Sequence, residues 1–232
     1  MPNFQRDTDG MLKTNLEAYY KLEDVTDFFN DNDLTNGNSV AFNAGKVNSA
    51  ANTGSNNTNK NLQILSDLGI QGGNISINLW INLTTVPSAE KIIAIQGDDG
   101  THVQYQLSYT GTTWRAVRDK TNVSAAEVIE THTPNADTWY NLALTYNGSN
   151  MELWRNGISK GSVASSGNGV SGASEAFTLF STHGGSQLVS GLIDECGVWS
   201  KKLSNTEIED LYNDGSGQTM QGDFVPKLMT IF

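Results

Sequence analysis

The sequence predicts an all-β sandwich of two antiparallel sheets with one short helix near its C-terminal end. Apolar and polar residues alternate strictly from Asn74 to Thr84, which is the pattern of a half-buried strand. The stretch from Trp139 to Gly157 also alternates and contains two Asn-Gly turns, which predicts a meander of short strands. A capping box formed by Ser204 and Glu207 predicts the helix. At 232 residues, the chain suits one large all-β domain.

The strand that precedes this helix is expected to be central. It runs from Leu192 to Trp199, and apolar residues occupy both of its faces. Imperfect alternation puts Ile193 and Trp199 on one face. The other face then holds three apolar residues, Leu192, Cys196 and Val198.

The helix itself has the spacing of an amphipathic segment. Leu203 precedes the cap and Ile208 lies four residues into the helix, which is the spacing of a hydrophobic staple. Ile208, Leu211 and Tyr212 form an apolar stripe that must pack against another element. Gly215 is expected to end the helix.

The rest of the chain is rich in strand and turn signals. The acidic stretch EDVTDFFNDNDLTNG, residues 23–37, is predicted to be a loop that closes in the tight-turn pair Asn36-Gly37. Further short strands are expected at Ala18 to Leu22, Val40 to Asn43, Lys91 to Gln96, Val103 to Tyr109 and Thr113 to Val117.

Composition excludes several classes of function. The formal net charge is −11, and the 14 Lys and Arg residues are scattered, which argues against a nucleic-acid partner. Cys196 is the only cysteine, so the chain has no intrachain disulfide and no cysteine-based zinc site. No segment has the length and apolarity of a transmembrane helix, and the first ten residues lack the apolar run of a signal peptide.

Two stretches carry a family resemblance. GLIDECGVWSKKLSNTEIEDLY (191–212) and WYNLALTYNGSNMELWRNG (139–157) resemble the bacterial and viral laminin-G-like domains of the concanavalin A-like lectin/glucanase superfamily. The resemblance covers roughly Ala18 to Tyr212 and implies a jelly roll whose first strand lies near its last one. We therefore expect an N-terminal segment at 1–17, a jelly roll at 18–215 and an apolar C-terminal tail at 216–232.

The chain lacks the carboxylates that the glucanases of this superfamily use. The glucanases that this family resembles usually carry their two carboxylates at positions i and i+4 of one strand, in a Glu-x-Asp-x-Glu run. This sequence has no such run. A glycosidase needs two carboxylates at a defined separation across its substrate. Asp194 and Glu195 are adjacent, so we expect them to point to opposite faces of a strand, each stabilised by hydrogen-bond partners. The sequence therefore predicts that the protein is not an enzyme.

Calcium is the one cofactor that the resemblance suggests. Members of the family often hold one Ca²⁺ between an N-terminal acidic loop and the Asp of the final Ile-Asp-Glu, which corresponds here to Asp24 or Asp27 with Asp194. Carboxylate and carbonyl oxygens are suitable ligands for this ion. The alternative is that the loop acids are solvated and keep the protein soluble.

Sugar recognition on jelly rolls commonly uses aromatic platforms, because a sugar has apolar CH faces as well as polar edges. Four aromatic residues lie opposite the main apolar registers and are candidates for this role: Trp80, Tyr109, Trp114 and Trp154. The alternative is that they belong to the core, where large aromatic side chains are common.

The C-terminal tail suggests docking onto another subunit. Its apolar end includes Leu228, Met229, Ile231 and Phe232, and such a surface must be buried against the domain or a partner. We expect a non-catalytic recognition or structural module, with glycans and neighbouring virion or homo-oligomer subunits as candidate partners. The favoured role is a decoration, fibre-head or tail-associated protein on the surface of a virion, such as a bacteriophage. The alternatives are a secreted carbohydrate-binding or adhesion domain and, against the missing carboxylate run, a glycoside hydrolase.

Overall fold

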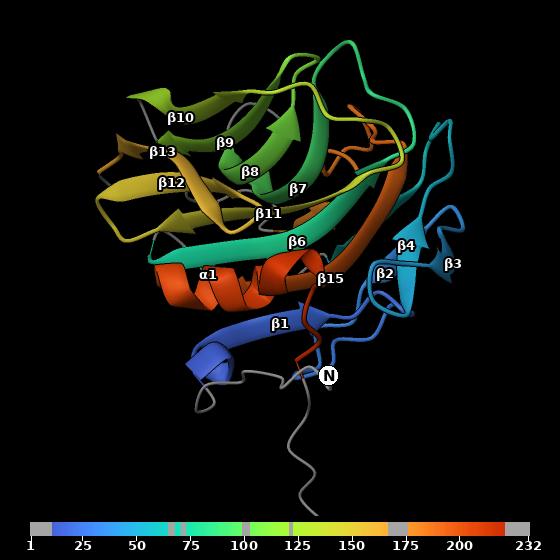
Figure 1. Ribbon diagram of the computed structural model, residues 1–232, viewed down its shortest axis with the longest axis horizontal. Coiled ribbons are helices and arrows are strands. Elements are labelled where there is room, and N and C mark those ends of the chain that lie inside the picture. The colour runs from blue at the N-terminus through green and yellow to red at the C-terminus, as the bar shows by residue number, and fades with distance from the viewer. Residues whose placement is uncertain are drawn as a thin grey trace, which may run out of the picture.

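The protein is a sandwich of two antiparallel sheets (Figure 1). The computed structural model describes residues 11–64, 68–70, 73–98, 103–120, 123–166 and 176–220. Spatial order in the eight-stranded sheet is Ile158–Ala164 (β13), Asn150–Arg155 (β12), Trp139–Tyr146 (β11), Ile75–Leu83 (β6), Gly191–Trp199 (β15), Ser49–Asn52 (β4) and Ala41–Ala44 (β3), with Leu16–Tyr20 (β1) also paired to β15.

The second sheet has seven strands. Their spatial order is Val123–Thr131 (β10), Thr113–Lys120 (β9), Val103–Tyr109 (β8), Lys91–Asp98 (β7), Phe177–Leu179 (β14), Asn61–Ile64 (β5) and Thr35–Gly37 (β2). Three short helices complete the described elements: Met11–Lys13 (η1), Asn205–Tyr212 (α1) and Asn213–Gly215 (η2). The predicted all-β sandwich with one short C-terminal helix is confirmed.

Apolar side chains fill the space between the sheets. Alternate residues of β6, beginning with Ile75 and Ile77, belong to this core, as do the inward residues of β11 such as Leu142 and Leu144. The sequence predicted that β6 is only half buried, yet all nine of its residues are buried. A second apolar cluster on the outer face of the eight-stranded sheet accounts for the difference.

That outer cluster contains residues from both ends of the described chain. Its members are Leu12, Leu16, Tyr19, Ala143, Trp154, Trp199, Leu203, Ile208, Leu211 and Met220. Figure 1 shows α1 lying against this face, beside β6, β15 and β1. The chain before residue 18 and after residue 215 thus packs on the sheet, and the predicted domain limits at 18 and 215 cut through packed structure.

A β-bulge divides β15 into two halves. Leu192 and Ile193 pair with β4, whereas the half from Cys196 to Trp199 pairs with β1. The register against β6 shifts between Asp194 and Gly197, and Glu195 has a left-handed φ of 49°. The pairing of the first and last strands is therefore as the family resemblance implied.

The bulge also corrects the predicted faces of β15. Ile193, Cys196 and Val198 all belong to the core between the sheets, whereas Trp199 belongs to the outer cluster. An extra residue in one strand reverses the alternation beyond it, because side chains change face at every residue. The sequence assignment of Ile193 and Trp199 to one face was therefore wrong.

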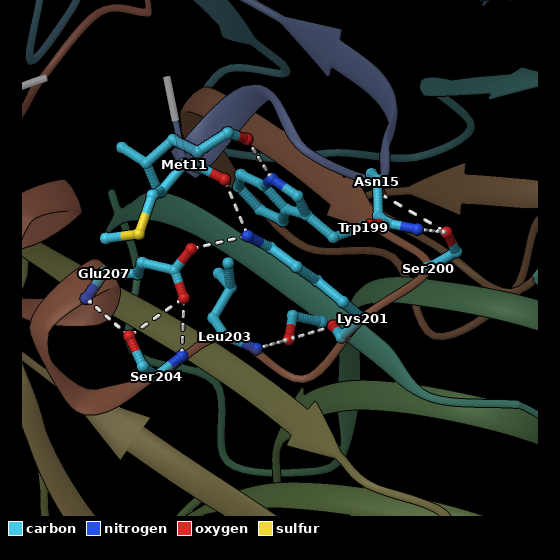
Figure 2. Close-up of polar contacts among 10 residues, drawn as sticks. Met11, Asn15, Trp199, Ser200, Lys201, Leu203, Ser204 and Glu207 are labelled. Carbon is cyan, nitrogen blue, oxygen red and sulfur yellow. Dashed lines mark hydrogen bonds and ion pairs between the residues drawn. The ribbon is translucent and has the colours of Figure 1, made fainter. Parts of the chain in front are cut away.

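The capping box of α1 forms as predicted (Figure 2). Ser204 Oγ accepts a hydrogen bond from the Glu207 amide at 3.3 Å, and the Ser204 amide donates to Glu207 Oε2 at 2.8 Å. The α-helix ends at Tyr212, where Asn213 caps it in the left-handed conformation, and Gly215 follows one turn later. Tyr212 stacks on Trp80 with ring centroids 5.7 Å apart.

Polar contacts connect η1 to this junction (Figure 2). Lys201 Nζ donates to the carbonyl oxygen of Met11 at 2.7 Å and pairs with Glu207 Oε1 at 2.5 Å. Trp199 Nε1 donates to the carbonyl oxygen of Leu12 at 2.6 Å. These bonds hold the two ends of the described chain on the same face of the sheet.

The predicted Asn-Gly turns have different outcomes. Asn156 and Gly157 both have positive φ, as the predicted hairpin turn requires, and Gly148 has a φ of 85° in the preceding turn. Asn36 and Gly37 instead lie in β2, and the left-handed turn comes one residue later at Asn38 and Ser39. No helix among the described residues is long and apolar enough to cross a membrane.

Candidate binding site

A pocket of about 360 Å³ opens where three connections of the sandwich meet. Its walls come from residues 55–57 after β4, residues 85–89 before β7, and Leu188 and Ser190 before β15, with Lys91 at the start of β7. This volume lies within the range of small-molecule sites in proteins, which is about 300–1,000 Å³.

Hydrogen bonds that are buried or partly buried hold the walls of the pocket together. Asn57 Nδ2 donates to the carbonyl oxygens of Lys60 and Val189, each at 2.8 Å, and the Asn57 amide donates to Ser190 Oγ at 2.8 Å. Thr84 adds a backbone bond to the Ser190 carbonyl oxygen at 3.2 Å. Because these bonds tie all three connections to each other, the pocket is formed before any ligand arrives.

The lining combines an apolar part with unused polar groups. Val86, Pro87 and Leu188 supply the apolar surface. The side chains of Asn56 and Ser88 form no hydrogen bond with any other residue in the part of the chain that the structure describes. Such a mixture complements a ligand that has both hydroxyl groups and apolar CH surface.

No carboxylate lines the pocket, and the nearest acid in sequence is engaged elsewhere. Glu90 Oε1 accepts from Arg115 Nη1 at 2.6 Å, from Ser108 Oγ at 3.0 Å and from Gln106 Nε2 at 3.1 Å. Arg115 Nη2 also pairs with Glu127 Oε1 at 2.5 Å. One guanidinium thus binds both carboxylates, and neither of them lines the pocket. A glycosidase instead needs two carboxyl groups that face the scissile bond of its substrate.

The bulge in β15 places Asp194 and Glu195 on the same side of the sheet. Asp194 pairs with the outward residue Trp80 and accepts from the backbone amides of Lys46 and Val47, each at 2.8 Å. Glu195 accepts hydrogen bonds from Tyr19 Oη and, at 2.7 Å, from Thr219 Oγ1, both on the outer face. The prediction that the two side chains point to opposite faces was wrong. Glu195 lies in the bulge, where the chain carries one extra residue and the regular alternation of faces is interrupted.

Burial perturbs both of these carboxyl groups. It raises the pKa of Asp194 to about 8, although three backbone amides donate to this carboxylate and oppose the shift. It raises the pKa of Glu195 to about 7, against the hydrogen bonds from Tyr19 and Thr219. Only 5% of Glu195 and none of Asp194 is exposed, so neither can reach a polysaccharide substrate.

The four aromatic candidates for sugar binding are all buried. Tyr109 and Trp114 lie in the core between the sheets with no exposed surface. Trp80 is 2% exposed beneath Tyr212, and Trp154 is 3% exposed in the outer cluster, where its Nε1 donates to Thr145 Oγ1 at 3.2 Å. Their burial corrects the prediction that these rings form a platform, in favour of the alternative that they pack in the interior.

The three predicted calcium ligands do not converge. Asp24 Oδ1 accepts from the Thr26 amide, and Asp27 Oδ1 accepts from the amides of Tyr19 and Phe29. Both oxygens of Asp194 also face backbone amides, which are donors and not metal ligands. Among the described residues, no three His, Cys, Asp or Glu side chains gather around a possible metal position. Calcium binding therefore stays a prediction that this geometry does not favour.

The comparison with protein families decides the identity of the fold. A family model described as the concanavalin A-like lectin/glucanases superfamily matches residues 53–209, which is more than half of the chain. The chain belongs to this superfamily. No protein with a curated description matches the sequence.

Solved structures of the concanavalin A-like fold agree with this assignment. Domain 4 of AbnA, a GH43 extracellular arabinanase from Geobacillus stearothermophilus, in complex with arabinotriose, has a TM-score of 0.67 and 17% identity over 84% of this chain and 97% of its own. The binding domain of Paraclostridial Mosquitocidal Protein 1 has a TM-score of 0.71 and 15% identity, over 88% of this chain and 53% of its own.

A third structure of the same fold is a toxin domain. The botulinum neurotoxin serotype D ligand binding domain in complex with N-acetylneuraminic acid has a TM-score of 0.70 and 15% identity, over 87% of this chain and 51% of its own. This chain thus spans about half the length of the toxin domains and nearly all of the arabinanase domain. At these identities the likeness shows the fold alone.

Sequence reasoning missed the pocket of this superfamily member altogether. Its residues fall in three polar stretches, around Asn57, Pro87 and Ser190, that are far apart in the sequence. Each stretch has the turn residues of a connection, which was a usable signal, but only the order of the strands brings them together. The tail residues Leu228, Met229, Ile231 and Phe232 lie outside the described residues.

Proposed function

We propose that this protein is a non-catalytic carbohydrate-binding module that holds its ligand in the pocket lined by residues 55–57, residues 85–89, Lys91, Leu188 and Ser190. The observation that carries the proposal is the lining of the pocket. Unused polar side chains surround an apolar patch, and no carboxylate is present to attack or protonate a glycosidic bond.

The comparisons support a binding role over an enzymatic one. The arabinanase domain that this chain covers almost completely has arabinotriose bound, and the toxin structures are binding domains. A preformed pocket also lowers the entropic cost of binding, because its walls need no reordering. We therefore propose that the ligand is an oligosaccharide or a terminal sugar of a glycan.

We further propose that the module acts outside cells. The arabinanase is extracellular, which supports a secreted carbohydrate-binding or adhesion domain. A decoration, fibre-head or tail-associated role on a virion surface fits the same recognition chemistry. Incorporation into a particle would distinguish this role from that of a secreted domain.

A variant that fills the pocket tests the binding role. Ala89 is exposed and lines the pocket, so Ala89→Trp should block the ligand without disturbing the core. Ala125→Trp makes the same change at an exposed position of β10 and serves as the matched control. Glycan-array binding by the wild type and the control, lost in Ala89→Trp, is the expected result. No binding to any glycan by the wild type, or equal binding by Ala89→Trp, would contradict the proposal.

The absence of catalysis is tested separately. We expect no release of reducing sugar from a panel of β-glucans, arabinans and xylans. Turnover by the wild type that disappears in Glu90→Gln or Asp194→Asn would make the protein a glycoside hydrolase.

A further inference from the structure

We infer that the pocket selects anionic saccharides, sugars that carry a carboxylate or a sulfate group, and that Lys91 binds the anion. This inference rests on the proposed carbohydrate-binding function and specifies its ligand class. Lys91 is the only charged residue among those that line the pocket, all of which the structure describes.

The charge of Lys91 is available to a ligand. Its side chain forms no ion pair and no hydrogen bond with another residue in the described part of the chain. The adjacent Glu90 forms no ion pair with Lys91 among the described residues, and its Oε1 lies 2.6 Å from Arg115 Nη1. Lys91 is half buried at the first position of β7, so its backbone is fixed by pairing with Tyr109.

The surrounding groups suit a sugar that bears one anion. Asn56 and Ser88 offer an amide and a hydroxyl without partners among the described residues, and Val86 and Leu188 offer apolar surface. A free inorganic anion could accept hydrogen bonds from these donors, but it would leave the apolar surface of Val86 and Leu188 without a contact. A sugar ring can contact the apolar surface while its hydroxyls reach the amide and hydroxyl.

The negative net charge of the protein means that an anionic ligand needs the ammonium group of Lys91 in order to bind. At a net charge of −11, the long-range field of the protein repels anions. Binding of an anionic sugar therefore requires a specific contact at short range. A charge-assisted hydrogen bond from an ammonium group to a carboxylate or sulfate is such a contact.

Matched ligand pairs test the inference directly. The carboxylate pair is the methyl glycoside of N-acetylneuraminic acid and its methyl ester, which has nearly the same shape without the charge. The sulfate pair is galactose 6-sulfate and galactose. Isothermal titration should show the charged member of at least one pair binding more tightly by about tenfold, as expected for one charge-assisted bond in a partly exposed pocket.

Three variants identify the source of the selectivity. Lys91→Gln should lose the tenfold preference, and Lys91→Arg, which keeps the charge, should retain most of it. Lys60→Gln removes one charge from the neighbouring loop without touching the pocket lining and should leave the preference unchanged.

The outcomes separate the inference from the function on which it rests. Equal binding of charged and neutral sugars, with no effect of Lys91→Gln, would overturn the inference and leave the carbohydrate-binding function standing. An equal loss in Lys60→Gln and Lys91→Gln would also overturn it, since a general field would then explain the preference. Failure of every glycan to bind would overturn the proposed function itself.

Discussion

Replacing Glu195 with glutamine should remove one part of the pH dependence of stability of this domain, while buried Asp194, whose pKa is also raised, keeps its own part. The carboxyl group lies beneath the C-terminal segment, between Tyr19 Oη and Thr219 Oγ1, and is 5% exposed. A glutamine of the same shape can accept from one hydroxyl and donate to the other. The substitution therefore removes the ionisation and keeps the packing.

The sign of the effect follows from the raised pKa. In the unfolded chain Glu195 ionises near its ordinary value of 4.5, whereas burial raises its pKa in the folded protein to about 7. Between these values the folded state binds more protons than the unfolded state, so the free energy of unfolding falls as the pH rises. At 1.36 kcal/mol for each pKa unit, the loss contributed by this group is on the order of 3 kcal/mol.

Urea unfolding followed by tryptophan fluorescence measures this free energy at a series of pH values. From about pH 4.5 to about pH 8, Glu195→Gln should gain on the order of 3 kcal/mol relative to the wild type. Glu209→Gln removes a carboxylate from an exposed position of α1 and should follow the wild type at every pH. Parallel curves for the wild type and Glu195→Gln would show that Glu195 does not titrate in this window and would refute the reasoning.

Three further predictions follow from the fold. Ser204→Ala should lower the free energy of unfolding by about 1 kcal/mol through loss of the capping box, while Thr206→Ala, at an exposed position of the same helix, should change it little in a urea titration. Chelation with EDTA should leave the melting temperature unchanged, because backbone amide donors surround the Asp194 carboxylate. A melting temperature that rises with added calcium would restore the calcium hypothesis. Deletion of residues 223–232 should leave a folded domain, because the residues of both apolar clusters lie within 11–220. An unfolded product would contradict this prediction, whereas a folded product that no longer self-associates or enters a particle would support the docking role of the tail.

Local features of the fold could be predicted from the sequence. The capping box at Ser204 and Glu207 depends on residues within one helical turn, and the turn at Asn156 and Gly157 depends on the φ values that these two residues tolerate. The family resemblance added the pairing of β1 with β15, which joins residues more than 170 positions apart.

Features that depend on neighbouring elements could not be predicted. Alternation in β6 identifies two faces but does not show that α1 covers the outer one, so the sequence pattern alone leaves Trp80 as a candidate for an exposed platform. The faces of β15 were misassigned because no residue pattern marks the bulge at Glu195. The pocket around Lys91 requires the strand order of both sheets, which periodicity alone does not contain.

The most direct test of the account locates the bound sugar. Isotope-labelled protein titrated with the tightest-binding oligosaccharide from the array should show its largest amide chemical-shift changes at residues 55–57, 85–91 and 188–190. Changes that cluster instead around Gln106 and Arg115, on the outer face of the seven-stranded sheet, would contradict the claim that the pocket at the three connections is the binding site.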